Sequence, residues 1–299
     1  MRLSIKWKIF VWCFGLALAI VAFNYWFTTE LVKKTTDKSS QELQGTYRRY
    51  KSFEQSYGSY MAAAASVWAT SPQLRQAFAK DDDAAAKPII AQLEQSLAQT
   101  VKPAFVMLFD KRGDVTSSGA IDASQARGLR AVADVRAGLA IKDGLLENDG
   151  RAYLIAGEPV LANGETVGGL LIGVHLETVF GEFKRQTDDD PKKQVELALV
   201  HNQRTTASAA HADDWDDLAR ATRPEARETI TEGGEKIQVL SLPDGQHDFF
   251  AAQLNGYEGS TLGSVGSLFF LRNRVERVRK MDNLIRDTFT VAAFALGLA

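Results

Sequence analysis

The two ends of the chain are hydrophobic, and the long stretch between them is polar. Residues 9–27 carry no charge and one polar side chain, Asn24, and they are numerous enough to cross a bilayer as a helix. Basic residues lie within 1–8, and cytoplasmic flanks of membrane helices carry an excess of Lys and Arg. We therefore predict a cytoplasmic N-terminus at 1–8 and an uncleaved transmembrane helix at 9–27, with a cleaved signal peptide as the alternative.

The last segment, residues 288–299, is also uncharged but is too short to span a membrane by itself. We expect it to be the start of a second transmembrane helix that is truncated in this sequence, and to follow a juxtamembrane helix at 272–287. That helix is indicated by an apolar stripe made of Leu271, Val275, Val278, Ile285 and Phe289. Basic residues just before 288 oppose the positive-inside tendency, so a peripheral amphipathic C-terminus is the alternative.

Helical spacing dominates residues 28–100, the lead-in to the body of the chain. Residues 28–69 contain no proline, and their larger apolar residues recur at helical steps: Leu43, Tyr47, Tyr50, Tyr57, Met61, Ala64 and Trp68. Glu54 interrupts this stripe, so the helix either covers the sheet of its own subunit or packs against the same helix of a second subunit. Ser71 and Pro72 predict the start of another helix, and a third is predicted at 84–100.

The spacing of apolar residues then becomes that of strands. Short apolar runs bounded by turn residues predict strands at 104–110, 115–118, 144–147, 152–161 and 166–176, with a helix at 122–138. The turn Asn163-Gly164 separates the last two strands. An antiparallel sheet with helices beside it belongs to the α+β class, and we assign this module to 101–185.

A second set of elements follows in a similar order. Strands are predicted at 195–201, 205–209, 227–231, 236–242, 249–254 and 264–270, with a helix near 213–222. The charged, proline-containing residues 186–193 suit an exposed linker between the copies. The sequence therefore predicts two sheet modules in tandem, at 101–185 and 194–271.

The composition limits the classes of partner. The chain has 35 basic and 37 acidic residues, and the basic ones are dispersed rather than gathered in a stripe. Nucleic-acid binding is therefore not expected. The single cysteine, Cys13, lies in the first apolar segment, so the body has no disulfide and depends on an ordinary core.

Four segments together resemble the bacterial tandem Cache sensor domains, whose two PAS-like modules lie outside the membrane between two spans. They are residues 69–78 (ATSPQLRQAF), 105–117 (FVMLFDKRGDVTS), 153–160 (YLIAGEPV) and 167–176 (VGGLLIGVHL). The first module matches this pattern better than the second. The pattern that marks amino-acid-binding members is not evident, so amino-acid recognition is not carried over.

The resemblance implies the sensory region of a transmembrane receptor in the bacterial inner membrane, with its body on the periplasmic or extracellular side. Its output would be an absent cytoplasmic histidine kinase, nucleotide cyclase or chemotaxis module. A small ligand in the membrane-distal module, 101–185, would shift the helices that enter the membrane. The expected partners are the lipid bilayer, a small molecule and a second copy of the chain in a homodimer.

The sequence carries no persuasive catalytic or metal-binding pattern, so we expect no enzyme activity and no cofactor in these residues. The four histidines lack the spacing of a metal site, and the aspartate runs at 188–190 and 213–217 lack the alternating ligands of a calcium loop. These runs are expected to be solvated turns and helix starts.

The polar candidates for ligand contact lie on the predicted strands and helix of the first module. They are Tyr153, Arg151, Asp110, Ser117, Arg130 and His175. Alternation alone does not tell which face of the sheet each one occupies. Two other hypotheses remain: a sensor of a protein partner or of the membrane state, which a filled apolar face would favour, and an anchored periplasmic enzyme.

Overall fold

The computed structural model describes residues 5–79, 83–187, 195–209, 227–232, 235–242, 245–257 and 266–274, together with Asn283, Arg286 and Thr290. The chain divides into two compact units. The first consists of Met1–Gln44, Ala221–Phe250 and Leu271–Ala299, and the second of Gly45–Arg220 and Ala251–Phe270. The helix predicted near 213–222 and most of the C-terminal segment lie outside the described residues.

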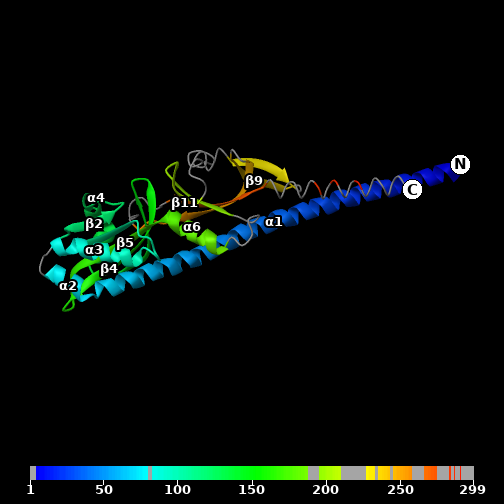
Figure 1. Cartoon of the computed structure of the whole chain (residues 1–299). Helices are drawn as coiled ribbons and strands as arrows, with labels where there is room; N and C mark the ends of the chain where they lie inside the picture. The colour runs from blue at the N-terminus through cyan, green and yellow to red at the C-terminus, as the bar shows by residue number, and fades with distance from the viewer. Residues whose placement is uncertain are drawn as a thin grey trace. The chain divides into compact units, whose positions relative to one another are not determined.

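One long helix, α1 (Ile5–Ala69), opens the chain and has 65 residues (Figure 1). Three residues of the predicted apolar stripe, Leu43, Tyr50 and Met61, are each at most 1% exposed, and its other four residues are half-buried. The structure thus shows the first of the two predicted arrangements, in which the helix covers its own subunit. Across the part of the chain that the structure describes, no helix combines the length and apolarity that a membrane span requires.

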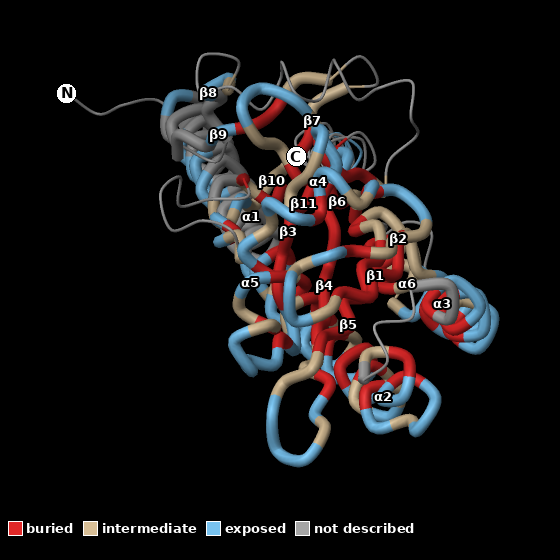
Figure 2. Tube along the Cα trace, turned by 90° about the vertical axis from the view of Figure 1, so that its left-hand side faces the viewer, coloured by how far each residue is buried: buried red, intermediate tan, exposed pale blue. Residues whose placement is uncertain are grey.

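The first module is a five-stranded antiparallel sheet in the order β2-β1-β5-β4-β3. Its strands are β1 (Phe105–Asp110), β2 (Val115–Gly119), β3 (Ile141–Asn148), β4 (Arg151–Ala162) and β5 (Glu165–His175). All five agree with the predicted strands within a few residues. The central strands β1, β5 and β4 are buried over most of their length, as the red tube in Figure 2 shows.

Helices cover both faces of this sheet. The face that carries Phe105, Met107 and Tyr153 packs under α4 (Ala123–Arg127) and α5 (Arg130–Arg136). The opposite face is reached by α2 (Pro72–Ala79), whose Phe78 contacts Gly168. Two further helices, α3 (Asp83–Leu97) and α6 (Leu176–Thr187), also contact the sheet strands. The α+β class is therefore confirmed.

Two predicted features of the first module are wrong. The single helix expected at 122–138 is two helices, because Gly128 caps α4 and Leu129 adopts extended backbone angles before α5 begins. The segment from Leu176 to Thr187 is a helix, α6, that the sequence reasoning missed, so residues 186 and 187 belong to a helix and not to a linker. Residues 188–194 lie outside the described residues.

The second sheet has six strands in the order β7-β6-β11-β10-β9-β8. They are β6 (Glu196–His201), β7 (Arg204–Ser208), β8 (Arg227–Glu232), β9 (Glu235–Leu242), β10 (Gly245–Leu254) and β11 (Gly266–Asn273). Five of these strands, in the spatial order β7-β6-β11-β10-β9, correspond to β2-β1-β5-β4-β3 of the first sheet. Strand β8 is an additional strand at the edge. The predicted repeat is therefore confirmed in the order of the strands. The predicted start of the juxtamembrane helix at 272 is wrong, because β11 continues to Asn273.

Candidate functional site

Strand register shows which candidate side chains share a face of the first sheet. Residues directly opposite each other in an antiparallel pair project to the same side. Tyr153 pairs with His175, and Ser117 pairs with Met107, whose neighbour on the same face is Phe105. Arg151, two residues before Tyr153, shares this face by alternation. Four of the six candidates thus lie on the face that α4 and α5 cover, which we call the α5 face.

The centre of the α5 face is filled by aromatic rings that lie over glycines. Phe105 stands opposite Gly173 and Phe109 opposite Gly169 across the β1–β5 pair. A Cβ atom added to either glycine would overlap the ring of its partner. Gly157 on β4 is enclosed in the same way, since an added Cβ would lie 2.8 Å from Val135 Cγ2. The glycines therefore provide the space that the chain's own rings occupy, and this centre is apolar and packed.

A polar rim adjoins this packed centre where β4 begins and β5 ends. The Tyr153 ring lies between Phe105, at 5.4 Å between centroids, and His175, at 4.9 Å. Tyr153 is 2% exposed, so its ring is buried between these two neighbours. We call the group Arg151, Tyr153, His175 and Glu177 the rim.

Burial and the charge of Arg151 set the protonation states of the rim. Burial raises the pKa of the Tyr153 hydroxyl, and the guanidinium opposes this rise. Burial lowers the pKa of His175, and the Arg151 charge lowers it further, so the imidazole is neutral near pH 7. Burial raises the pKa of Glu177, with Arg151 acting against it. The rim therefore offers a cation, a phenol and a neutral imidazole, which can bind a polar or anionic group.

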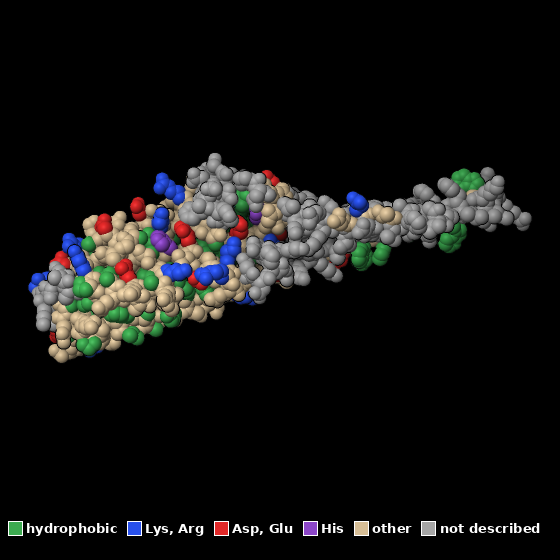
Figure 3. Space-filling view, in the orientation of Figure 1, with side chains coloured by type: hydrophobic (Ala, Val, Ile, Leu, Met, Phe, Trp, Pro, Cys, Tyr) green, Lys and Arg blue, Asp and Glu red, His purple; other side chains and the backbone are tan. Residues whose placement is uncertain are grey.

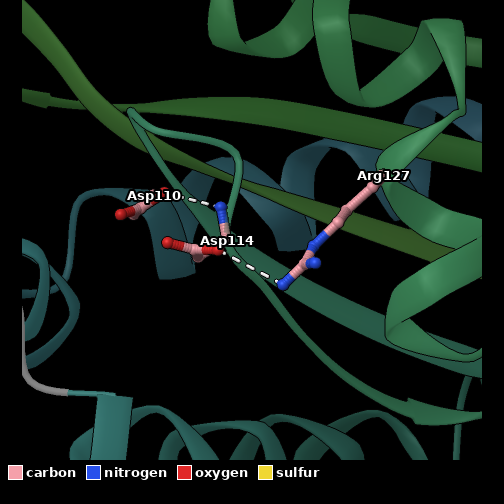
Figure 4. Close-up of polar contacts among 3 residues, drawn as sticks. All are labelled: Asp110, Asp114 and Arg127. Carbon is pink, nitrogen blue, oxygen red and sulfur yellow. Dashed lines mark hydrogen bonds and ion pairs between the residues drawn. The ribbon is translucent and has the colours of Figure 1, made fainter.

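The other three predicted candidates have local structural partners. Asp110 Oδ1 accepts a hydrogen bond from the backbone N–H of Asp114, 2.8 Å away, and Arg127 contacts the Asp114 carboxylate at 3.2 Å (Figure 4). Together these contacts close the turn between β1 and β2. Asp110, paired with Gly168, also projects from the face opposite the rim.

Ser117 and Arg130 are likewise engaged close by. Ser117 Oγ donates to the carbonyl of Ile121 at 2.5 Å, and Arg130 Nε lies 3.3 Å from Asp134 Oδ2. The structure therefore brings Arg151, Tyr153 and His175 together and leaves Asp110, Ser117 and Arg130 apart from them. Glu177 completes the rim, and sequence reasoning missed it because it lies in the first turn of the unpredicted α6.

A residue of the segment between β10 and β11 also reaches the α5 face. The backbone N–H of Tyr257 donates to the carbonyl of Leu145 at 2.6 Å, and its hydroxyl contacts Asp134 Oδ2 on α5 at 3.0 Å. The ring lies against Gly144, whose added Cβ would be 3.1 Å from it. Tyr257 therefore ties the chain of the second sheet to α5 and to the edge strand β3.

A second contact acts on the same edge strand. His201 on β6 contacts the carboxylate of Glu147 on β3 through its Nδ1 atom. Together with Tyr257, it holds the free edge of the first sheet, which would otherwise expose unpaired backbone groups. No group of three or more metal-ligating side chains occurs among the residues that the structure describes.

Solved structures of sensor domains resemble this chain. The ligand-binding domain of the Pseudomonas aeruginosa amino acid chemoreceptor PctB, solved with L-Arg, is 12% identical, with a TM-score of 0.50 over 81% of this chain and 97% of that one. The Vibrio cholerae histidine kinase DctB sensor domain is 12% identical, with a TM-score of 0.47 over 80% and 98%. The Campylobacter jejuni chemoreceptor Tlp3 domain, solved with L-valine, is 12% identical, with a TM-score of 0.47 over 83% and 96%.

The likeness to PctB, at this low identity, shows the fold. No curated protein matches the sequence significantly. A family model described as "Double sensory domain of two-component sensor kinase" matches residues 37–266, which include both sheets up to the start of β11. This match agrees with the resemblance noted in the sequence and with the repeated strand order. The chain belongs to the double Cache family of sensory domains.

Proposed function

We propose that this chain is the extracytoplasmic sensory region of a bacterial transmembrane receptor and that a small polar ligand binds at the rim of the first module. The observation that supports it is the rim itself. The Tyr153 ring is buried between the rings of Phe105 and His175, and the charges of Arg151 and Glu177 act on its hydroxyl. A ligand with a carboxylate or a hydroxyl group suits these side chains.

The proposed topology anchors the chain at 9–27 and again from 288 onward. Large apolar side chains on the N-terminal part of α1 are exposed, namely Trp12, Phe23 and Trp26, which favours contact with lipid over contact with water. The stimulus would favour one of two arrangements of the first module, and the helix that the sequence predicts after β11 would carry the change to a cytoplasmic kinase, cyclase or chemotaxis module.

The second candidate function is a sensor of a protein partner or of the membrane state. It is favoured by the packed centre of the α5 face, where the rings of Phe105 and Phe109 fill the space over Gly173 and Gly169. A ligand would then find room only at the rim. Under this alternative the rim closes the module and binds nothing.

A thermal-shift screen distinguishes the two candidates. The chain of residues 1–299, purified in detergent, is screened against carboxylates, amino acids and other metabolites. A ligand at about 100 times its Kd stabilises the folded state by about 2.7 kcal/mol, which raises Tm by several degrees. We expect such a shift in the wild type and in Arg127→Gln, an exposed arginine away from the rim, but not in Arg151→Gln or Tyr153→Phe. Shifts that survive both rim substitutions would refute binding at the rim.

We further propose that the receptor is a homodimer joined through α1. The face of α1 that points away from its own sheet carries Ser56, Tyr60, Ala63 and Val67, all exposed. The sequence has no charged residue from 55 to 74, and the edge of the molecule that α1 follows shows mostly hydrophobic and neutral side chains (Figure 3). An uncharged exposed face on a helix suits a second copy of the same helix.

Disulfide crosslinking tests the dimer. In a Cys13→Ser background, Ser56→Cys and Ala63→Cys lie on the exposed face, whereas Ala62→Cys lies on the buried one. We expect rapid crosslinked dimers for positions 56 and 63 and none for 62. Equal crosslinking at all three positions, or at none of them, would contradict a dimer through this face.

A further inference from the structure

Helix α1 contains a carboxyl group buried in the interior of the chain. Glu54 is 2% exposed; its Oε2 contacts Lys51 Nζ, and its Oε1 has no hydrogen-bond partner in the described part of the chain. Four residues earlier, Tyr50 is 0% exposed, and its hydroxyl also has no partner there. Residues four apart lie on the same side of a helix. Two buried polar atoms without partners are thus neighbours, which is costly unless they are satisfied in another way.

Tyr50 is the centre of an aromatic cluster that joins three elements. Its ring lies 5.6 Å from Phe180 and 5.5 Å from Phe183, both on α6, and 5.9 Å from Phe270 on β11. Helix α6 follows the last strand of the first sheet, and β11 is the last strand before the C-terminal segment. A change at Tyr50 therefore acts on α1, on α6 and on the strand that leads to the proposed second span.

Burial favours the protonated form of Glu54. The groups that face it are Lys51 and Tyr50 on its own helix and Asp143 on β3, while α6 and β11 surround Tyr50 with rings. Burial is the largest effect and raises the pKa of Glu54; Lys51 and the hydroxyl of Tyr50 oppose the rise, and Asp143 adds to it. Burial and the Glu54 charge raise the pKa of Tyr50 well above its usual value, so the phenol keeps its proton.

We propose that Glu54 takes up and releases a proton as the external pH changes, and that this proton controls the packing of Tyr50 against α6 and β11. A protonated carboxyl has an O–H group, and the Tyr50 oxygen can accept it, so one proton satisfies both atoms. Loss of the proton leaves a buried carboxylate near Asp143. The Lys51 ammonium and the Tyr50 hydroxyl, which must then turn to donate its own proton, compensate this charge only in part, and the buried charge loosens the cluster. The buried pair is thus a pH-sensitive device built into α1, and it acts independently of any ligand at the rim.

The sign of the pH effect follows from the raised pKa. The unfolded chain releases this proton near the ordinary glutamate value of 4.5, whereas the folded chain keeps it to a higher pH. Stability therefore falls as pH rises from about 4.5 to the folded pKa and then levels off. Glu54→Gln keeps the shape of the side chain and has an N–H donor at every pH. The loss of stability that comes from deprotonation of Glu54 should therefore be absent in this variant.

The test compares urea unfolding midpoints of the full chain in detergent between about pH 4.5 and pH 7.5. We expect the midpoint to fall with rising pH in the wild type and, equally, in Glu165→Gln, an exposed control on β5. In Glu54→Gln the midpoint should fall less with rising pH, because the proton that Glu54 releases no longer contributes. A slope for Glu54→Gln equal to that of the wild type would overturn the proposal.

Two direct readouts keep the proposal testable if Glu54→Gln does not fold. The carboxyl carbon of Glu54, followed by NMR in the wild type, should titrate above 4.5. A fluorinated phenylalanine at position 270 should shift with the same midpoint, and this shift should vanish in Tyr50→Phe, which keeps the ring and removes the acceptor. A Glu54 midpoint at or below 4.5, or a signal at 270 that does not change with pH, would overturn it.

Discussion

The two sheets share an order of strands but differ in how deeply their central strands are buried. In β4 a run of six residues from Ala152 to Gly157 is buried, so both faces are covered (Figure 2). In β10, which has the corresponding place in the second sheet, only His247 and Leu254 are buried. The first sheet is thus a core between two layers of helices, whereas β10 keeps solvent contact along most of its length.

This difference in burial indicates that a stimulus can switch the first sheet, but not β10, between distinct arrangements. A sheet packed on both faces has few voids, and packed cores change between distinct arrangements rather than deform gradually. The rings of Phe105 and Phe109 fill the α5 face only because glycines stand opposite them. A ligand or partner that displaces one ring must therefore move α5 or the edge strand β3. The half-exposed β10 has no comparable constraint.

The largest expected effect is a cavity in the first sheet. Phe105→Ala should lower the free energy of unfolding by about 3–5 kcal/mol, because the ring is fully buried between Gly173 and Tyr153. Phe249→Ala makes the same change on β10, where the ring is only partly buried and lies under the Arg227 guanidinium. Its loss should be about 1–2 kcal/mol. Urea unfolding of both variants measures the difference, and equal losses would show that the two sheets are packed alike.

A smaller effect is expected where the chain of the second sheet contacts the first. Tyr257→Phe removes the hydroxyl that contacts Asp134 and should cost about 0.5–1.5 kcal/mol. Asp134→Asn should lower the free energy of unfolding less in the Tyr257→Phe background than in the wild type, because the Tyr257 hydroxyl that contacts Asp134 is then already absent. Strict additivity of the two substitutions would mean that the contact does not join the two sheets.

The strands could be predicted because their signals are local. Alternation and turn residues such as Asn163-Gly164 mark a strand without reference to the rest of the chain. The helices were predicted less well where two signals overlap. The apolar spacing of Leu129, Val132 and Val135 begins directly after the break at Gly128 and does not show that a separate helix precedes it. Helix α6 follows β5 directly, so its apolar first residue, Leu176, reads as the end of that strand.

The site could be predicted only in part, because it depends on contacts between distant residues. Arg151 and Tyr153 share a face by alternation on one strand, but their meeting with His175 depends on the register of β4 and β5. The packed centre depends on β1 pairing with β5, about sixty residues later. Tyr257 is more than a hundred residues from Asp134, and no local pattern distinguishes it from other loop tyrosines.

The smallest effect is expected at the start of α4, at the border of the enclosed α5 face. Asp122 Oδ1 accepts hydrogen bonds from the backbone N–H groups of Ser124 and Gln125, both at 2.8 Å, and the backbone N–H of Asp122 donates to Gln125 Oε1 at 3.2 Å. The bond from Gln125 is the main cause that lowers the pKa of Asp122 below its ordinary value of 3.8. The ionised carboxylate therefore stabilises this capping box.

The pH dependence of this cap has a definite sign. Because the folded pKa is lowered, the stabilisation is present above pH 3.8 and is lost as the pH falls through the folded pKa. Asp122→Asn keeps an oxygen that can accept the same hydrogen bonds, so it should lower Tm only slightly at neutral pH. The loss of stability that protonation of Asp122 causes at acidic pH should be absent in this variant. Asp149→Asn, at an exposed turn, is the matched control. If Asp122→Asn loses as much stability as the wild type between neutral and acidic pH, the cap does not contribute, and the α5 face owes its closure to its apolar packing alone.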